Sequence, residues 1–146
     1  GGDHSIIKLG LVLNDEIVSV MTFNKTEGRK KMIDGEWNLS RFSNKTDTNV
    51  VGGASKLLKY FIDKWKPTRI ISYADQDWSR GDLYYKMGFE NIKESGPDYK
   101  YIISGKRRHK SNYRKSKLSG KEKESIQMID FPKVWDCGKI KFEKKL

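Results

Sequence analysis

A run of small residues after Asn49 is the stretch of the sequence best suited to chemistry. Gly52, Gly53 and Ala54 stand directly before a segment whose apolar residues recur at helical spacing. A helix that begins after such a turn has backbone N–H groups without acceptors at its positive end, and small residues let an anion approach them closely. The turn therefore predicts a site for an anionic group, above all a pyrophosphate.

The elements that must position this turn follow from the sequence around it. The helix after the turn is marked by five apolar residues with charged residues between them, and Pro67 ends it. These five are Leu57, Leu58, Phe61, Ile62 and Trp65. Residues 69–74 are rich in β-formers and predict a strand, and residues 79–87 predict a second, shorter helix. The predicted order is strand, glycine turn, helix, strand, helix.

Two motifs in this order resemble the GNAT (N-acetyltransferase) superfamily. The glycine turn with the two leucines after it resembles that superfamily's G-x-G/A turn, and residues 83–89 (LYYKMGF) are similar to its L-Y-x-x-x-G-F signature. The resemblance implies an α/β (α+β) fold, with a mixed, mostly antiparallel sheet flanked by helices. It also implies acetyl-CoA or another acyl-CoA as cofactor, with no metal. The implied cofactor-binding residues are Val51, Gly52, Gly53, Ala54 and Ser55.

The turn departs from the superfamily pattern in two respects. Asn49 stands where the pattern begins with Arg or Gln, and Val50 and Val51 are bulkier than usual.

A narrower likeness covers roughly residues 9–142. Segments 52–61, 72–79 and 134–138 resemble the GNAT-like C-terminal domain that phages attach to homing endonucleases. That likeness implies an upstream nuclease domain as a partner and the host cell cytoplasm as the compartment.

The superfamily resemblance also suggests which residues act in acyl transfer. Tyr84 matches the tyrosine that often protonates the departing thiolate, although a tyrosine on the apolar face of a short helix is as often a core residue. Asp75 and Glu36, with Asp77, lie near strand ends that converge on the cleft of this fold, so each is a candidate base or an ordinary surface carboxylate. Cys137 is expected to be structural rather than nucleophilic.

Length and composition restrict the class of protein. The chain has 146 residues, 36% hydrophobic and 12% aromatic, which suits one globular domain with a real core. No apolar run is long enough to cross a bilayer and no signal segment opens the chain, so we expect no membrane partner and a cytoplasmic protein. One cysteine and two histidines make a disulfide framework or a zinc site unexpected.

The charge of the chain is strongly positive, with a formal net charge of +11. Residues 106–121 hold eight basic residues and no acid, which predicts attraction to nucleic acid rather than a merely solvated face. A ribosome-like or membrane-surface partner is the alternative, and the likeness to homing-endonuclease domains implies DNA. Tyr113 lies within this run and either stacks on a base or anchors the segment to the core. The predicted nucleic-acid-binding residues are Lys106, Arg107, Arg108, Lys110, Tyr113, Arg114, Lys115 and Lys117.

The remaining segments have the patterns of strands. Residues 9–23 predict a hairpin around Asn14-Asp15, and residues 37–42 predict a third strand. Residues 24–35 are typical of a polar surface loop. A strand from Ile92 is expected to pair with residues 99–103. Residues 133–136 are expected to pair with residues 139–142 and form a final hairpin.

We divide the chain into a GNAT-like core, 1–104, and a basic extension with the final hairpin packed on the core, 105–146. The strand and helices that usually open this fold are expected to be missing, because only eight residues precede Leu9.

Three functions remain open from the sequence. The first is a phage-type, acyl-CoA-dependent transferase that acts on nucleic acid and so modifies DNA. The second is a catalytically inactive GNAT-fold module that binds DNA for a homing endonuclease. The third is an N-acetyltransferase for a small molecule or a protein. No HNH, GIY-YIG or PD-x-K nuclease pattern is present in the sequence, so cutting by this chain itself is not expected.

Overall fold

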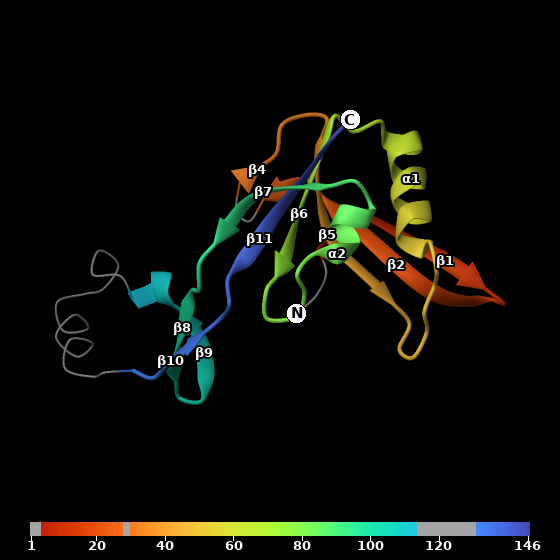
Figure 1. Ribbon diagram of the computed structural model, residues 1–146. Helices are drawn as coiled ribbons and strands as arrows, with labels where there is room; N and C mark the ends of the chain where they lie inside the picture. Colours follow the sequence, from red (N-terminus) through yellow and green to blue (C-terminus); the bar gives the residue numbers. More distant parts are fainter. Residues whose placement is uncertain (1–3, 28–29, 114–130) are drawn as a thin grey trace.

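The computed structural model describes residues 4–27, 30–113 and 131–146. A six-stranded sheet, in the order β1-β2-β5-β6-β11-β7, forms the body of the molecule (Figure 1). Its strands are β1 (Ile7–Leu13), β2 (Glu16–Asn24), β5 (Glu36–Asn44), β6 (Arg69–Asp75), β7 (Glu90–Ser95) and β11 (Lys139–Lys145). All of its pairings are antiparallel except the one between β5 and β6. The fold is therefore the predicted mixed, mostly antiparallel one.

Helix α1 (Gly53–Trp65) covers one face of this sheet, as the apolar spacing predicts. Phe61 is fully buried, and its ring stacks on that of Phe23 at 3.6 Å between centroids and meets Trp37 edge-on at 5.3 Å. The helix ends at Lys66, which adopts a left-handed conformation before Pro67, a residue that cannot continue it. This aromatic packing fixes α1 across β2 and β5.

The predicted N-terminal hairpin and third strand are confirmed. Asn14 and Asp15 have φ angles of 49° and 62° and form the turn between β1 and β2. In β5 the register with β2 shifts between Thr22 and Phe23, which marks a β-bulge. The bulge explains why Phe42 packs against the same core as Leu39 although strict alternation would place Arg41 there. The polar loop before β5 contains a small hairpin of β3 (Thr26–Glu27) and β4 (Lys30–Lys31).

Strand pairing after residue 90 differs from the prediction. β8 (Tyr99–Ile103) pairs with β9 (Lys106–His109) and β10 (Lys133–Trp135) in a separate three-stranded sheet, and not with β7. β11 pairs with β6 and β7, and not with β10, so residues 133–142 do not form the predicted final hairpin. Figure 1 shows the three-stranded sheet at the side of the body, connected through β7 and β11. The six-stranded and three-stranded sheets thus both take strands from both sides of residue 104, and the division at that residue stays a prediction.

The second helix is shorter than predicted. α2 spans Asp82–Lys86, and Gly81 before it has a φ of 84°. A Cβ at Gly81 would lie 2.3 Å from the Phe142 ring, so α2 begins in close contact with β11. A 3₁₀ turn, η1 (Lys110–Tyr113), follows β9. Within the described part of the chain, no helix is long and apolar enough to cross a bilayer.

Candidate functional site

The site is organised around a fork in the six-stranded sheet. β5 and β6 run parallel but pair only from Glu36 to Asn38 and from Arg69 to Ile71; beyond these residues the two strands no longer pair. The buried Ser72 marks the point of divergence. Its Oγ donates a hydrogen bond to the carbonyl of Leu39 on β5, at 2.8 Å. The fork therefore opens toward the carboxyl ends of both strands.

The glycine turn lies at the open end of this fork. Gly53 is next to Ser19, whose hydroxyl donates to Asn44, the last residue of β5, at 2.6 Å. Because Phe61 packs near the start of β5, α1 runs from the open end of the fork back toward the joined end. The positive end of the α1 dipole is consequently at the opening.

The turn is open at its first glycine. Gly52 is left-handed, with φ 72°, and a Cβ there would meet no heavy atom within 4 Å. No side chain caps the helix and its first turn has no acidic residue. Val51 is 91% exposed, and Val50 packs beside Gly53, where a Cβ would lie 2.9 Å from its Cγ1. The turn is therefore open at Gly52 and Val51, while the Val50 side chain lies against Gly53; the open part fits an anion.

A cavity of about 300 Å³ adjoins the turn between α1 and the end of α2. Its apolar floor is formed by Leu58, Ile62 and Met87. Ser55 and three lysines complete the lining: Lys59, Lys86 and Lys144. Lys144 is held in place because its Nζ donates to the carbonyl of Met87 at 3.0 Å. The cavity combines an apolar surface with cations, which suits a phosphorylated ring system.

Tyr84 reaches from α2 into the apex of the fork. Its phenolic oxygen lies 2.9 Å from Ser72 Oγ and 3.4 Å from the carbonyl of Tyr73, and its ring stacks on Phe142 at 4.8 Å. Burial raises the pKa of the Tyr84 phenol, and the hydrogen bond with Ser72 opposes this shift only in part. The phenol therefore keeps its proton at neutral pH, as a general acid must. The contacts with Phe142 also give Tyr84 the core role that the sequence left open.

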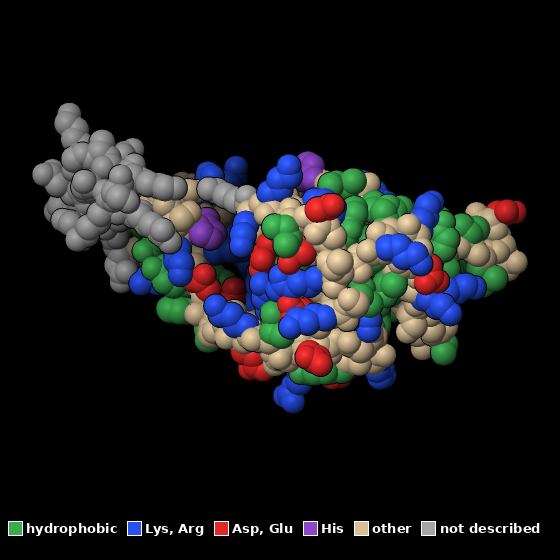
Figure 2. Space-filling model, turned by 90° about the horizontal axis from the view of Figure 1, so that it is seen from above, with side chains coloured by type: hydrophobic (Ala, Val, Ile, Leu, Met, Phe, Trp, Pro, Cys, Tyr) green, Lys and Arg blue, Asp and Glu red, His purple; other side chains and the backbone are tan. Residues whose placement is uncertain are grey.

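The two predicted carboxylates occupy different places. Glu36 is at the joined end of the fork, where its Oε1 accepts a hydrogen bond from Arg69 Nη1 at 2.9 Å. Asp75 ends β6, and its Oδ1 accepts the backbone N–H of Asp77 at 3.1 Å. Asp75 also lines a groove of about 640 Å³ between the end of β6 and the three-stranded sheet. Figure 2 shows a hollow in this part of the molecule. The hydrogen bonds of Tyr84 go to Ser72 and to the backbone rather than to either carboxylate, and the catalytic roles of Glu36 and Asp75 stay predictions.

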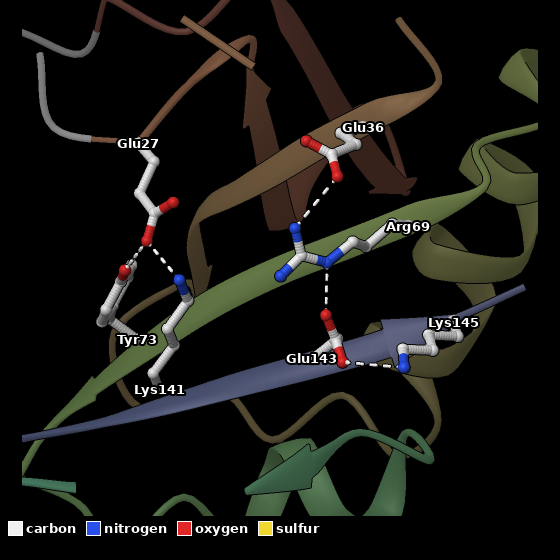
Figure 3. Close-up of polar contacts among 7 residues, drawn as sticks. All are labelled: Glu27, Glu36, Arg69, Tyr73, Lys141, Glu143 and Lys145. Atoms are coloured by element: carbon white, nitrogen blue, oxygen red, sulfur yellow. Dashed lines mark hydrogen bonds and ion pairs between the residues drawn. The ribbon is translucent and has the colours of Figure 1, made fainter. Parts of the chain in front are cut away.

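A polar cluster on the sheet was missed by the sequence analysis (Figure 3). Glu27, from the small hairpin, accepts hydrogen bonds from Tyr73 on β6 and from Lys141 on β11. These hydrogen bonds and the charge of Lys141 lower the pKa of Glu27, so its carboxylate is ionised at neutral pH. A weakly basic carboxylate is better suited to tying the hairpin to β6 and β11 than to removing a proton.

The second cluster in Figure 3 is centred on Arg69, between Glu36 on β5 and Glu143 on β11. Hydrogen bonds from Arg69 to both carboxylates raise the pKa of its guanidinium, so it stays charged. These pairs join three neighbouring strands at the closed end of the fork. Among the described residues, no group of His, Cys, Asp and Glu could hold a metal ion.

The predicted nucleic-acid-binding residues fall partly within the described chain. Lys106, Arg107 and Arg108 form the exposed strand β9, with Lys110 beginning η1. Tyr113 packs edge-on against Tyr101 of the three-stranded sheet at 5.7 Å, and both alternatives for Tyr113 stay predictions. Arg114, Lys115 and Lys117 lie outside the described residues.

Comparisons with known proteins identify the fold. No protein-family model and no curated protein matches the chain. Solved structures do match it, over most of its length. A GNAT-family acetyltransferase from Bacillus cereus has a TM-score of 0.53 and 14% identity, over 94% of this chain and 69% of that one. The ribosomal-protein-S18-alanine N-acetyltransferase from Escherichia coli has a TM-score of 0.57 and 11% identity, over 99% and 71%.

A third match is the PaiA N-acetyltransferase from Thermoplasma acidophilum in complex with coenzyme A, with a TM-score of 0.53 and 16% identity, over 97% of this chain and 62% of that one. At such low identities the likeness establishes the fold and not the reaction. The chain therefore has the GNAT acetyltransferase fold that the two sequence motifs predicted.

Proposed function

We propose that the chain is an N-acyltransferase that uses acetyl-CoA or another acyl-CoA. The observation that carries this proposal is the position of the open glycine turn and of Tyr84 on one fork, with the turn at its mouth and the phenol at its apex. The backbone N–H groups of residues 51–55 would hold the pyrophosphate, except that of Gly53, which already donates to the carbonyl of Val50 at 3.1 Å. Lys59, Lys86 and Lys144 would hold the phosphorylated nucleoside end in the adjoining cavity.

The chemistry divides between the cofactor and the chain. When bound, the cofactor supplies a thioester carbonyl to an amine. Tyr84 holds a proton at its phenolic oxygen that can be given to the leaving thiolate, and the buried environment that raises its pKa keeps that proton in place. In the transfer the C–N bond forms and the C–S bond breaks; the amine loses one proton and the thiolate gains one, so Tyr84, a phenolate after donation, must regain a proton from solvent or from the amine.

The acceptor is proposed to be an amine on nucleic acid, and in particular on DNA of a phage-infected cell. Support comes from the net charge of +11, the exposed basic strand β9 and the likeness to domains attached to phage homing endonucleases. An inactive DNA-binding module with an upstream nuclease domain, and a transferase for small molecules or proteins, are the competing proposals.

Cofactor binding is tested by calorimetric titration of acetyl-CoA into the full chain. Ser55→Glu is the decisive variant, because the exposed Ser55 lies in the first turn of α1. A carboxylate there favours the helix dipole and leaves the fold stable, yet repels pyrophosphate. We expect micromolar binding that weakens at least tenfold in Ser55→Glu. Asn112→Glu, which also introduces a glutamate but at an exposed site in η1, should bind like wild type. Absence of binding at millimolar acetyl-CoA would refute the transferase and leave the binding module.

Nucleic-acid binding is tested by reversing the charges of Arg107, Arg108 and Lys110 together. For a duplex, the slope of log affinity against log salt should become shallower by about 0.9 for each phosphate that the variant no longer neutralises. An unchanged affinity would show that the basic strand does not bind nucleic acid.

A further inference from the structure

The three-stranded sheet presents two different faces, and one of them combines aromatic and basic side chains. Directly opposed residues of antiparallel strands share a face. Tyr99 is opposite Trp135, Tyr101 is opposite both Arg108 and Lys133, and Ile103 is opposite Lys106. We call this set the aromatic face: Tyr99, Tyr101, Ile103, Lys106, Arg108, Lys133 and Trp135.

The rings of the aromatic face form a continuous strip. The ring of Tyr99 lies 5.0 Å from that of Trp135 and 5.4 Å from that of Tyr101. The Nζ of Lys133 lies 5.1 Å from the Tyr99 centroid and 6.0 Å from that of Tyr101, within range of a cation–π contact. None of these rings belongs to the hydrophobic core of the six-stranded sheet, and Trp135 is 59% exposed. Tyr99 and Tyr101 are half-buried, and the rings of Tyr113 and Phe131 pack against Tyr101, so Trp135 is the exposed ring of the strip and the one open to a ligand.

The charge on the aromatic face has one sign. Its three charged residues, Lys106, Arg108 and Lys133, are all basic and exposed. The acidic residues next to these strands already have partners, and one such pair lies at the edge of the face, because the Nζ of Lys110, which pairs with Asp98, is 5.1 Å from the Tyr99 centroid. Asp136 accepts the backbone N–H groups of Asp98 and Gly138, and Asp98 accepts that of Tyr99 and pairs with Lys110.

We infer that the aromatic face binds single-stranded nucleic acid, with an unpaired base stacked on Trp135 and phosphates held by Lys106, Arg108 and Lys133. Stacking requires an open base face, which a duplex hides and a single strand offers. An exposed ring flanked by cations matches both parts of such a ligand. The inference rests on the proposed nucleic-acid function and specifies where and in what form the nucleic acid binds.

The first test removes a ring. Binding of a fluorescently labelled 12-nucleotide single strand to the full chain is followed by anisotropy, with the same sequence as a duplex for comparison. Trp135→Ala should weaken single-strand binding by roughly 5- to 150-fold, the range for loss of one stacked base. Trp135→Phe, which keeps a ring, should retain most of the affinity. Tyr60→Ala is the matched control, because Tyr60 is 51% exposed and lies on α1, away from the three-stranded sheet. It should change binding less than twofold.

The second test separates the face from general electrostatic attraction. Arg107 and Arg108 are neighbours on β9, both exposed, and their side chains alternate between the two faces. Arg108→Glu should weaken single-strand binding at least fivefold more than Arg107→Glu, although the net charge changes equally. Equal losses, or wild-type affinity in Trp135→Ala, would overturn the inference.

Failure of the inference and failure of the proposed function give different results. If Arg107→Glu and Arg108→Glu weaken binding equally, nucleic-acid binding stands and only the aromatic face is refuted. Acetyl-CoA binding should be the same in wild type and Trp135→Ala, which also shows that the variant is folded. A duplex bound more tightly than the single strand would likewise refute the aromatic face as the site.

Discussion

Ser72→Ala and Tyr84→Phe test separately the two side chains that meet at the start of the fork. Ser72 Oγ has one proton and lies within hydrogen-bonding distance of both the Leu39 carbonyl and the Tyr84 phenol. Ser72→Ala removes a side-chain link across the start of the fork and leaves two partly buried polar groups short of a partner. With roughly 1 kcal/mol for each hydrogen bond, and more where a buried group stays unpaired, we expect a loss of about 2 kcal/mol in the free energy of unfolding.

Tyr84→Phe should affect stability and catalysis differently. Ser72 still donates to Leu39 in this variant and the stacking on Phe142 is kept, so the loss of unfolding free energy should be about 1 kcal/mol or less. If Tyr84 is the general acid, kcat should fall by about 10² to 10⁴ with little change in the affinity for acetyl-CoA.

The two quantities need separate assays. Urea unfolding followed by tryptophan fluorescence gives the stability, and Ser43→Ala, at an exposed site on the same strand as Leu39, serves as control. Coenzyme A release should be followed by chromatography, because the exposed thiol of Cys137 would react with thiol reagents. A Tyr84→Phe variant that keeps kcat within twofold would refute the acid role and leave Tyr84 as a core residue. A Ser72→Ala variant as stable as Ser43→Ala would refute the bridging role of Ser72.

Two further predictions concern the fold. Gly81→Ala should lower the free energy of unfolding by about 2 to 4 kcal/mol, because its Cβ would be 2.3 Å from the Phe142 ring at a φ of 84°. Thermal unfolding measures this loss, and Gly96→Ala, which has open space around it, should be nearly neutral. Equal stability of the two variants would contradict the packing of Gly81 on Phe142. Glu27 has a lowered pKa, so its ion pair with Lys141 stabilises the fold above about pH 4.5 and is lost as the pH falls through the lower pKa of the folded protein. Glu27→Gln should therefore be less stable than wild type at pH 7 by about 1 kcal/mol, with a difference that shrinks in acid; a difference independent of pH would refute this account.

Local patterns predicted the elements of the site well. The glycine turn, α1 and the Tyr84 helix each depend on residues close together in sequence, where helical spacing, a left-handed glycine and a terminating proline act directly. The β1–β2 hairpin is likewise local, with a turn of two residues. These features needed no knowledge of the rest of the chain.

Long-range pairings could not be predicted in the same way. In β11, buried Ile140 and Phe142 alternate with more exposed residues, which indicates one buried face but not the neighbouring strands. Pairing sequence neighbours placed this strand beside β10, whereas it lies between β6 and β7. Glu27 was missed for the same reason, because its partners Tyr73 and Lys141 are 46 and 114 residues away.

The two proposed sites are related through the end of β6. The fork opens toward the carboxyl end of this strand. The turn that follows is hydrogen-bonded to the segment leading into β11. The backbone N–H of Cys137 donates to Asp77 at 2.7 Å, and that of Gln76 donates to the carbonyl of Gly138 at 3.0 Å. The hydrogen bonds to Asp77 lower the pKa of its carboxyl group, so the attachment persists over the whole neutral range. The three-stranded sheet is thus joined to the body at the end where the fork opens.

Under the proposed function, this attachment fixes how a nucleic-acid strand bound to the aromatic face is presented to the fork. Loosening it with Asp77→Ala should then reduce transfer to nucleic acid more than binding of either acetyl-CoA or the single strand, whereas equal losses in all three would mean that the attachment serves only stability.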